Sequence, residues 1–558
     1  MFNKKIKLIF VFLLIYPNFI FAKSKDFNSE DLSRYFSGIV AFDNKDNSNA
    51  LNFFNSSKIL TNRHDAYLEK LVKALVLENK VAQAINILKL NKGKKNSDFF
   101  EAYILLALDG LKKNEFKITS KILSEVPEYL QSDRFNYIIL ETFKQYTYLF
   151  KEKKFLNNNQ NFGNFSSINH TFQNCYLGDK KTSSLFSKLI NSKEGDYSRY
   201  VYFYLTYLIN NNEFDKAKNL VSDIDYINST LLISQGKSWF ENKEFKKFNK
   251  IFSCKNHNDV VGEFLFLVSN LYSSQDEFQK SNFYLSLSNY SNPRFIFNLS
   301  LVAENFFLNK DYKKAEVILK KFNKKQDFYY WYRIRKEAQI ISKKKNQKEG
   351  LKYITSKFDK ISNPNSRMIF DIANFYKNSK NYFQAIRYYS LIIDSLDENS
   401  ELKSDLLYRR GGSYERIKDY KNADKDLLNS LRIKPNDAYV LNYLAYSWLE
   451  RNYKIDEAIQ MLEQAYELKS DDPYIIDSIG WGYYLIDDFV KAEKFLKRAV
   501  EMMPGDPIVN DHYGDILWKL DRKIQARYFW SMVLKMSDTE KEMIDKINIK
   551  LIKGLEKS

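Results

Sequence analysis

The chain has 558 residues, a net charge of +18 and 16% aromatic residues. It contains only 16 Gly and 8 Pro, too few for a large α/β enzyme, because the tight turns and strand ends of such enzymes use both residues. The composition therefore predicts an all-α protein. Length alone would suggest about four domains, but an array of helical repeats grows by addition and needs no separate cores.

The first 22 residues resemble a secretory signal peptide. Lys4, Lys5 and Lys7 precede an apolar run, and Ala22 precedes the polar Lys23, where we expect the mature chain to start. The alternative is an uncleaved N-terminal anchor, which is disfavoured because the apolar run is well short of about 20 residues. In either case we expect the following residues to be exported. No cysteine lies near the cleavage point, so a lipid-anchored protein is not expected.

Residues 23–360 carry an uneven pattern of small residues at the spacing of helix hairpins. Ala303 with Ala315 marks a clear unit, whereas Ser269 with Ser281 marks a divergent one. A recurring phrase places Asn, Lys or Asp before an acid or Asn and then an aromatic, and we expect it to form the turn of each hairpin. The phrase occurs at Asn212-Glu213-Phe214, Lys243-Glu244-Phe245, Asp276-Glu277-Phe278, Lys310-Asp311-Tyr312 and Lys380-Asn381-Tyr382.

One segment interrupts this pattern. Residues 155–184 are rich in Asn, Ser and Gly, so we expect a loop or an irregular repeat there. Cys175 lies in this segment and Cys254, the other cysteine, lies about two repeats further on. Stacked repeats contact mainly their neighbours, so two separate thiols are expected, with a disulfide as the alternative.

Residues 361–540 carry the most regular part of the pattern. Ala423, Ala458, Ala492 and Ala526 fall 34 or 35 residues apart, each following Gly or Ala by twelve or thirteen residues. Asp472-Pro473 and Asp506-Pro507 are typical helix starts, with an N-cap carboxylate before a proline at the first helical position. These small, aromatic, alanine and proline positions resemble the tetratricopeptide repeat (TPR) family. The resemblance implies an all-α solenoid of antiparallel helix hairpins wound into a right-handed superhelix, followed at 541–558 by a C-terminal helix or tail.

In this family the first helix of each hairpin lines the concave face, so the repeat phase indicates which side chains face a groove. We expect an aromatic and acidic groove suited to an extended peptide or a helix with basic residues. The alternative is that the aromatic residues pack between repeats. The groove residues expected from the phase are Tyr439, Asn442, Tyr446, Tyr474, Asp477, Trp481, Tyr484, Asp511, Asp515 and Trp518. The basic clamp by which some family members hold a terminal carboxylate is not expected here.

The last 120 or so residues carry a narrower resemblance. Asp477-Ser478-Ile479-Gly480-Trp481, followed by His512-x-Gly514-Asp515, is similar to envelope TPR proteins of Gram-negative bacteria. One such group consists of adaptors that hold a carboxyl-terminal processing protease and its substrates at the outer membrane. The resemblance implies a location in the periplasm or cell envelope, although the lipid-anchor cysteine of those adaptors is missing here.

No motif indicates chemistry. The four histidines share no metal-ligand spacing, and no phosphate-binding loop occurs. We therefore expect no catalytic, cofactor or metal site, and we expect that the protein is not an enzyme. Residues 371–558 contain 29 Lys and Arg against 32 Asp and Glu, so the excess positive charge lies in residues 1–370. Its lysines are scattered, which favours a solvated surface over a nucleic-acid site.

Two functions follow from the sequence. The first is an exported scaffold or adaptor that binds a protein or peptide partner in its groove, such as an envelope protease or an assembly factor. The alternative is a structural component of a secretion or envelope-assembly complex. Under both, no nucleic acid is bound, and any association with the envelope membrane is peripheral and made through partners.

Overall fold

The computed structural model describes residues 29–62, 64–156, 160–193, 196–537 and 539–555. The expected signal peptide, residues 1–22, lies outside them. Over these ranges the chain is helical and contains no strand, which confirms the all-α solenoid of antiparallel hairpins. The chain divides into two compact units: unit 1 comprises residues 1–225 and 229–340, and unit 2 comprises residues 226–228 and 341–558.

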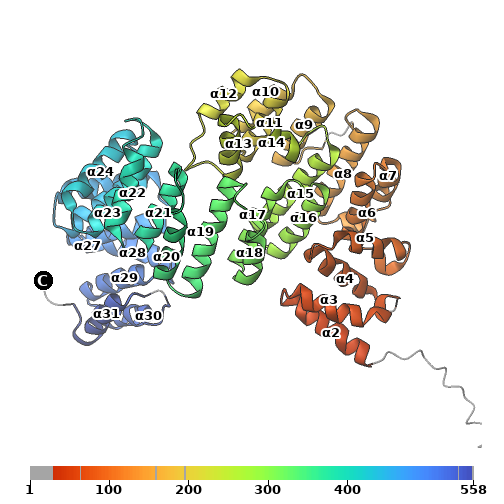
Figure 1. The fold of residues 1–558 in the computed structure, drawn as a ribbon. Coiled ribbons are helices and arrows are strands. Elements are labelled where there is room, and N and C mark those ends of the chain that lie inside the picture. The colour runs from red at the N-terminus through yellow and green to blue at the C-terminus, as the bar shows by residue number, and fades with distance from the viewer. Residues whose placement is uncertain (1–28, 63, 157–159, 194–195, 538, 556–558) are drawn as a thin grey trace, which may run out of the picture. The chain divides into compact units, whose positions relative to one another are not determined.

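Unit 1 is built mainly from helices that pair with their sequence neighbours (Figure 1). Its elements are α2 (Ser29–Asp43), α3 (Asn47–Ser56), η2 (Lys58–Asn62), α4 (Asp65–Leu77), α5 (Val81–Leu90), η3 (Lys95–Ser97), α6 (Phe100–Lys112), α7 (Phe116–Ser124), η4 (Glu128–Gln131), α8 (Arg134–Glu152), α9 (Asn164–Leu177), α10 (Thr182–Ile190), α11 (Arg199–Asn210), α12 (Phe214–Ser222), α13 (Leu231–Glu241), α14 (Lys246–Ile251), α15 (His257–Ser273), α16 (Phe278–Ser291), η5 (Ile296–Asn298), α17 (Leu299–Leu308) and α18 (Tyr312–Leu319), with α19 (Asp327–Lys344) running across the division.

Unit 2 is a regular array of hairpins in which each helix packs on the next. Its elements are α20 (Gln347–Phe358), α21 (Ser366–Asn378), α22 (Tyr382–Ile393), α23 (Glu401–Arg416), α24 (Tyr420–Ile433), α25 (Ala438–Glu450), α26 (Ile455–Leu468), α27 (Pro473–Leu485), α28 (Phe489–Met502), α29 (Pro507–Lys519), α30 (Lys523–Val533) and α31 (Lys541–Lys553).

The hairpin turns confirm the expectation from the recurring phrase. Its first residue has a left-handed backbone at every occurrence, with φ between +56° and +61°. This conformation reverses the chain: at Lys310, for example, the next N–H, that of Asp311, donates to the carbonyl of Phe306 at 2.8 Å. The Asp311 carboxylate then accepts from the N–H of Lys314 and caps the following helix. One short phrase therefore ends one helix and begins the next.

Small residues set the spacing of the helices in unit 2. We call the four regularly spaced alanines, Ala423, Ala458, Ala492 and Ala526, the ladder alanines. They are fully buried, because each lies where the second helix of a hairpin crosses the first. A Cβ added to Gly480 would lie 2.8 Å from Cγ of Leu496 on the partner helix, which is too close for carbon atoms. The small residues of the repeat pattern therefore mark the closest contacts between the helices.

Unit 1 departs from nearest-neighbour stacking. The α15–α16 hairpin packs against α4, α5, α6 and α8, which lie more than a hundred residues earlier (Figure 1). Lys112 on α6 donates to the carbonyl of Tyr290 at 2.6 Å, and Nε2 of His257 lies 3.0 Å from the carbonyl oxygen of Leu111. The weaker repeat pattern of residues 23–360 therefore accompanies contacts that the repeat period does not describe.

Residues 155–184, expected to form a loop or an irregular repeat, contain α9, which packs against α10. The expectation of two separate thiols is wrong, because Cys175 on α9 and Cys254, just after α14, form a disulfide with a Cα–Cα distance of 5.8 Å. The prediction failed because it assumed neighbour-only stacking, whereas the segment after α14 returns to α9.

None of the helices in the described ranges combines the length and the apolar character that a membrane span requires.

Candidate functional site

The ten residues expected in the groove lie on three successive first helices of unit 2. We call the surface formed by the first helices α21, α23, α25, α27 and α29 the A-helix face. Of the ten, α25 carries Tyr439, Asn442 and Tyr446; α27 carries Tyr474, Asp477, Trp481 and Tyr484; and α29 carries Asp511, Asp515 and Trp518. Because these helices pack side by side, the structure brings most of these residues into one network.

An aromatic stack forms the centre of this network. The Trp481 ring lies parallel to Tyr484, with centroids 4.6 Å apart, and parallel to His512 at 4.1 Å. The Trp481 indole donates from Nε1 to the exposed carboxylate of Glu450 on α25 at 2.8 Å. Trp481 and Tyr484 are half-buried, so each ring keeps an open edge. Such stiff rings supply contact area with little loss of conformational entropy.

A buried ion pair holds the His512 ring of the stack. Nδ1 of His512 donates to the two carboxylate oxygens of Asp477, at 3.1 and 2.9 Å. Burial opposes protonation of the imidazole, but Asp477 and the neighbouring Asp511 and Asp515 outweigh it and raise the pKa of His512. The expectation that Asp477 is exposed to a ligand is corrected here: its exposed fraction is 6%, because the next first helix covers it.

The acidic end of the network is covered by the last helix. Lys550 on α31 donates to Asp511 at 2.6 Å and to both oxygens of Asp515 at 2.7 and 2.8 Å. Trp530 donates to Asp515 from its indole at 3.0 Å. Burial and the Asp511 charge raise the pKa of Asp515 to about 6, although Lys550 opposes them. Asp515 is thus a packed carboxylate and not the exposed groove residue that was expected.

The position of α31 explains this correction. It packs on α30 and reaches α29, where the first helix of a further hairpin would lie. Lys550 stands 35 residues after Asp515, just as His512 stands 35 residues after Asp477. The segment around Gly554 also closes on the indole of Trp518, which is half-buried. The C-terminal helix therefore caps the array and uses the acids of α29 as its anchor.

The remaining expected residues lie nearer solvent. Tyr474 is 60% and Tyr439 46% exposed, and Tyr439 donates to Asp472 at 3.1 Å. Asn442 and Tyr446 are half-buried on α25. Burial raises the pKa of Tyr446, and the charges of Glu450 and Asp477 add to this effect. A role of the ten residues in binding stays a prediction.

Residues of opposite charge occur at the start of the array, and the sequence reasoning missed them. Burial lowers the pKa of Lys377 on α21, and the positive charges of Arg409 and Arg416 on α23 add to this effect. The ladder could have located them. Lys377 follows Ala373 by four residues, as Tyr484 follows Gly480, and Arg409 precedes Gly411 by two, as His512 precedes Gly514.

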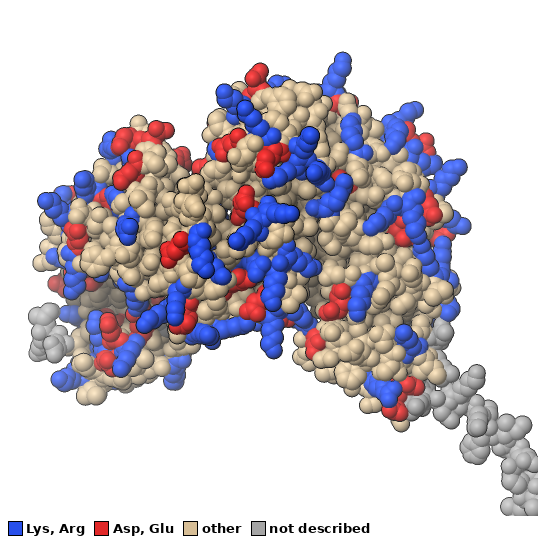
Figure 2. All heavy atoms as spheres, in the orientation of Figure 1, with Lys and Arg blue, Asp and Glu red and all other residues tan. Residues whose placement is uncertain are grey.

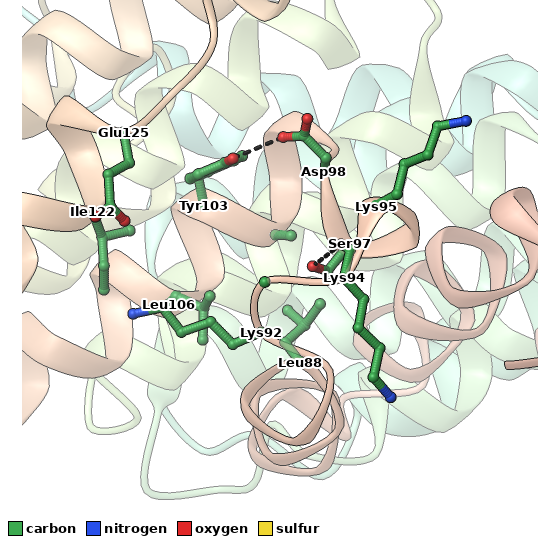
Figure 3. Close-up of a pocket in the computed structure, with 12 residues that line it drawn as sticks. Leu88, Lys92, Lys94, Lys95, Ser97, Asp98, Tyr103, Leu106, Ile122 and Glu125 are labelled. Atoms are coloured by element: carbon green, nitrogen blue, oxygen red, sulfur yellow. Dashed lines mark hydrogen bonds between the residues drawn. The ribbon is translucent and has the colours of Figure 1, made fainter. Parts of the chain in front are cut away.

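Unit 1 contains a pocket. It has a volume of about 310 Å³ and is lined by residues of α5, α6, α7 and their connections. The Tyr103 hydroxyl points to Asp98 and donates to it at 2.7 Å, whereas Lys94 and Lys95 extend away from the pocket residues (Figure 3). Asp98 also accepts from Tyr129 at 2.6 Å. Its carboxylate is therefore satisfied by the protein itself.

Charge on unit 1 is dispersed. On the face shown in Figure 2, Lys and Arg are scattered over its hairpins and interspersed with Asp and Glu. Within the described residues, no group of three or more His, Cys, Asp or Glu is placed to hold a metal ion.

The stacked helix hairpins form a TPR-type solenoid fold. The chain is similar to the TPR repeat-containing protein PA4667 of Pseudomonas aeruginosa, with 34% identity over 93 residues. This match covers 17% of the chain and 16% of that relative's length. No family model matches the chain.

Solved structures that match parts of this chain at low identity include two bacterial proteins and one yeast protein. A tetratricopeptide repeat protein from Parabacteroides merdae matches 46% of this chain and 98% of its own, at 16% identity and a TM-score of 0.39. Yeast Tom70 matches 94% and 95%, at 14% identity and a TM-score of 0.36. The pilF protein of Pseudomonas aeruginosa matches 34% and 83%, at 18% identity and a TM-score of 0.29.

Proposed function

We propose that the protein is an exported scaffold or adaptor that captures a protein or peptide partner on the A-helix face of unit 2. The observation that carries this proposal is the stack of Trp481, Tyr484 and His512 beside the exposed Glu450. Rigid aromatic rings next to a charged rim are typical of the anchor points of protein interfaces. Such a surface selects partners with basic and apolar side chains.

Two features support export. The N-terminal residues have the composition of a signal peptide. Cys175 and Cys254 are joined by a disulfide, and disulfides persist in oxidising compartments such as the periplasm. A periplasmic adaptor that recruits an envelope protease or an assembly factor fits both features.

Capture from the cell envelope tests the proposal. The variant E450Q/W481A/Y484A removes the exposed carboxylate and two rings while leaving Asp477, His512 and the ladder residues in place. We expect cross-linked partners of the unmodified protein to be lost from this variant, with its helical content unchanged. The control variant carries K494A and K497A on α28, the second helix of the same hairpin. If the triple variant and the unmodified protein capture the same partners, a spacer role within a larger assembly replaces the adaptor role.

A further inference from the structure

We infer that a second pocket in unit 1 binds an uncharged saccharide unit, held by tyrosine hydroxyls at its base and by neutral polar side chains at its rim. The pocket has a volume of about 400 Å³ and is lined by residues of α9, α11, α13, α15, α17 and α19 and of the segments leading into α11 and α13. Small-molecule sites have volumes of about 300–1,000 Å³. All of its residues belong to unit 1, so the inference does not depend on the partner-binding face of unit 2.

Two tyrosine hydroxyls at the base of this pocket lack protein partners. Tyr200 on α11 and Tyr329 on α19 line the pocket and are 3% and 2% exposed. Within the described residues, neither hydroxyl takes part in a hydrogen bond. The hydroxyl of Tyr202 is also unpartnered among these residues but is enclosed by protein, whereas those of Tyr200 and Tyr329 keep access to the pocket. Because an unpaired polar group in a buried position costs free energy, a ligand that hydrogen-bonds to the two tyrosines is stabilised.

Aromatic packing holds both tyrosine rings in place. The Tyr329 ring centroid lies 4.4 Å from that of Phe297 and 5.3 Å from that of Phe322. The Tyr200 ring centroid lies 6.0 Å from that of Phe172 on α9. Burial raises the pKa of both tyrosines, so their hydroxyls stay neutral and can donate as well as accept hydrogen bonds. The hydroxyls are therefore positioned before a ligand arrives, which reduces the entropy lost on binding.

The charges at the pocket disfavour an ionic ligand. Arg199 is the one basic residue among the described residues that line it, and its Nε and Nη2 donate to the two carboxylate oxygens of Glu263 at 2.7 and 2.8 Å. Asp196 at the rim is exposed and accepts from the N–H of Ser198 at 2.9 Å. An anion would meet a neutralised arginine and this carboxylate, which opposes its binding. A cation would find only Asp196, and a single exposed ion pair contributes little.

Apolar ring surface and neutral polar groups complete the site. The Arg199 guanidinium lies 3.7 Å from the Phe266 ring centroid and covers one face, and the half-buried ring presents its remaining surface to the pocket that it lines. The rim carries the exposed Asn164, Thr230 and Asn270, and Thr230 forms no side-chain capping bond to α13. A sugar ring has an apolar C–H face that packs on an aromatic ring and hydroxyls that both donate and accept. These groups therefore match a neutral saccharide.

Saturation-transfer NMR titrations of the purified full chain test the inference with four probes. Two are neutral disaccharides, cellobiose and N,N′-diacetylchitobiose. The third is chitobiose without its acetyl groups, which carries two ammonium groups, and the fourth is the capped neutral peptide acetyl-Ser-Ala-Ser amide. We expect at least one neutral disaccharide to bind, about tenfold or more tightly than the charged one.

The other outcomes of these titrations contradict the inference. If neither neutral disaccharide binds, the saccharide site is wrong. If the charged disaccharide binds as tightly as the neutral ones, the pocket does not select by charge as inferred. Binding of the capped peptide in place of the disaccharides would assign the pocket to a peptide segment.

Tyrosine variants locate the bound ligand. Y200F/Y329F removes both hydroxyls and keeps both rings, and we expect it to weaken binding of the neutral disaccharide about tenfold. Since neither hydroxyl has a partner within the described residues, the Tm of this variant should equal or exceed that of the unmodified protein. The control Y202F removes an unpartnered hydroxyl from the same helix, α11, outside the pocket lining, and should leave the affinity unchanged. Equal affinity of Y200F/Y329F and the unmodified protein, or an equal loss in Y202F, would overturn the inference.

Discussion

The imidazole of His512 on α29 donates to the carboxylate of Asp477 on α27, which lies 35 residues earlier, at 2.9 Å. The contact joins two successive first helices, and the His512 ring also stacks on Trp481. It has the same register as the contact between Lys550 and Asp515 one hairpin later. The array therefore repeats an electrostatic contact as well as a packing contact.

This pair predicts a dependence of stability on pH. The pKa of His512 is raised above its ordinary value of 6.5 in the folded state, so the folded protein binds this proton more tightly than the unfolded chain. The stabilisation is complete below about pH 6.5 and is lost as the pH rises through the raised pKa. We expect the Tm of the protein to fall more steeply above pH 6.5 than that of H512Q, measured by circular dichroism. Parallel pH profiles for the two proteins would contradict this assignment.

Lys550 is predicted to hold α31 in place. Replacing it with Met leaves Asp511 and Asp515 close together without their cation, and removal of one partner from a buried pair costs about 3–5 kcal/mol. We expect K550M to lower the free energy of unfolding by about this amount, with a smaller loss at pH 5, where Asp515 is protonated. Denaturant unfolding measures the change. K546M, on the exposed side of the same helix, should have little effect.

The ladder predicts a strong difference between two glycines. A methyl group at Gly480 would overlap Leu496, and overpacking of this kind costs about 1–3 kcal/mol. Gly505 is exposed, and a methyl group there would meet nothing within 4 Å. We expect G480A to lower the Tm and G505A to leave it unchanged or raise it slightly. Equal Tm values for G480A and G505A would show that the helices can separate at no cost.

The disulfide is predicted to stabilise unit 1. It joins residues separated by 79 positions, and closing a loop of this size contributes about 2–4 kcal/mol. Reduction should lower the Tm and retard the protein on a denaturing gel, and the C175S/C254S variant should no longer respond to reductant. Detection of two free thiols in the protein purified without reductant would contradict the pairing.

Much of the fold of unit 2 could be predicted from sequence, because close helix contacts require small residues and so leave a visible period. Ala423, Ala458, Ala492 and Ala526 marked these contacts correctly. The disulfide could not be predicted in this way, since the return of the α14 region to α9 breaks the neighbour-only rule of repeat stacking.

The sequence predicted which helices carry the site residues, but not how exposed their side chains are. The repeat phase placed Asp477 and Asp515 on first helices, but it could not show that the next helix covers each of them. Asp515 is covered by α31. This helix follows the last ladder alanine, Ala526, and has no small residue of the repeat pattern. The predicted residues lie on α25, α27 and α29, so the prediction did not include Lys377 on α21 or Arg409 on α23.

Site-specific photo-crosslinking in the native host tests the central claim most directly. A benzophenone side chain placed at Tyr484, on the A-helix face, should give a discrete adduct with a partner protein. The same group at Lys497, an exposed position of α28, should give none. An adduct from Tyr484 alone is the result that a partner-binding A-helix face requires. Adducts from Lys497 with none from Tyr484 would show that the partner is held elsewhere and would contradict the proposed function.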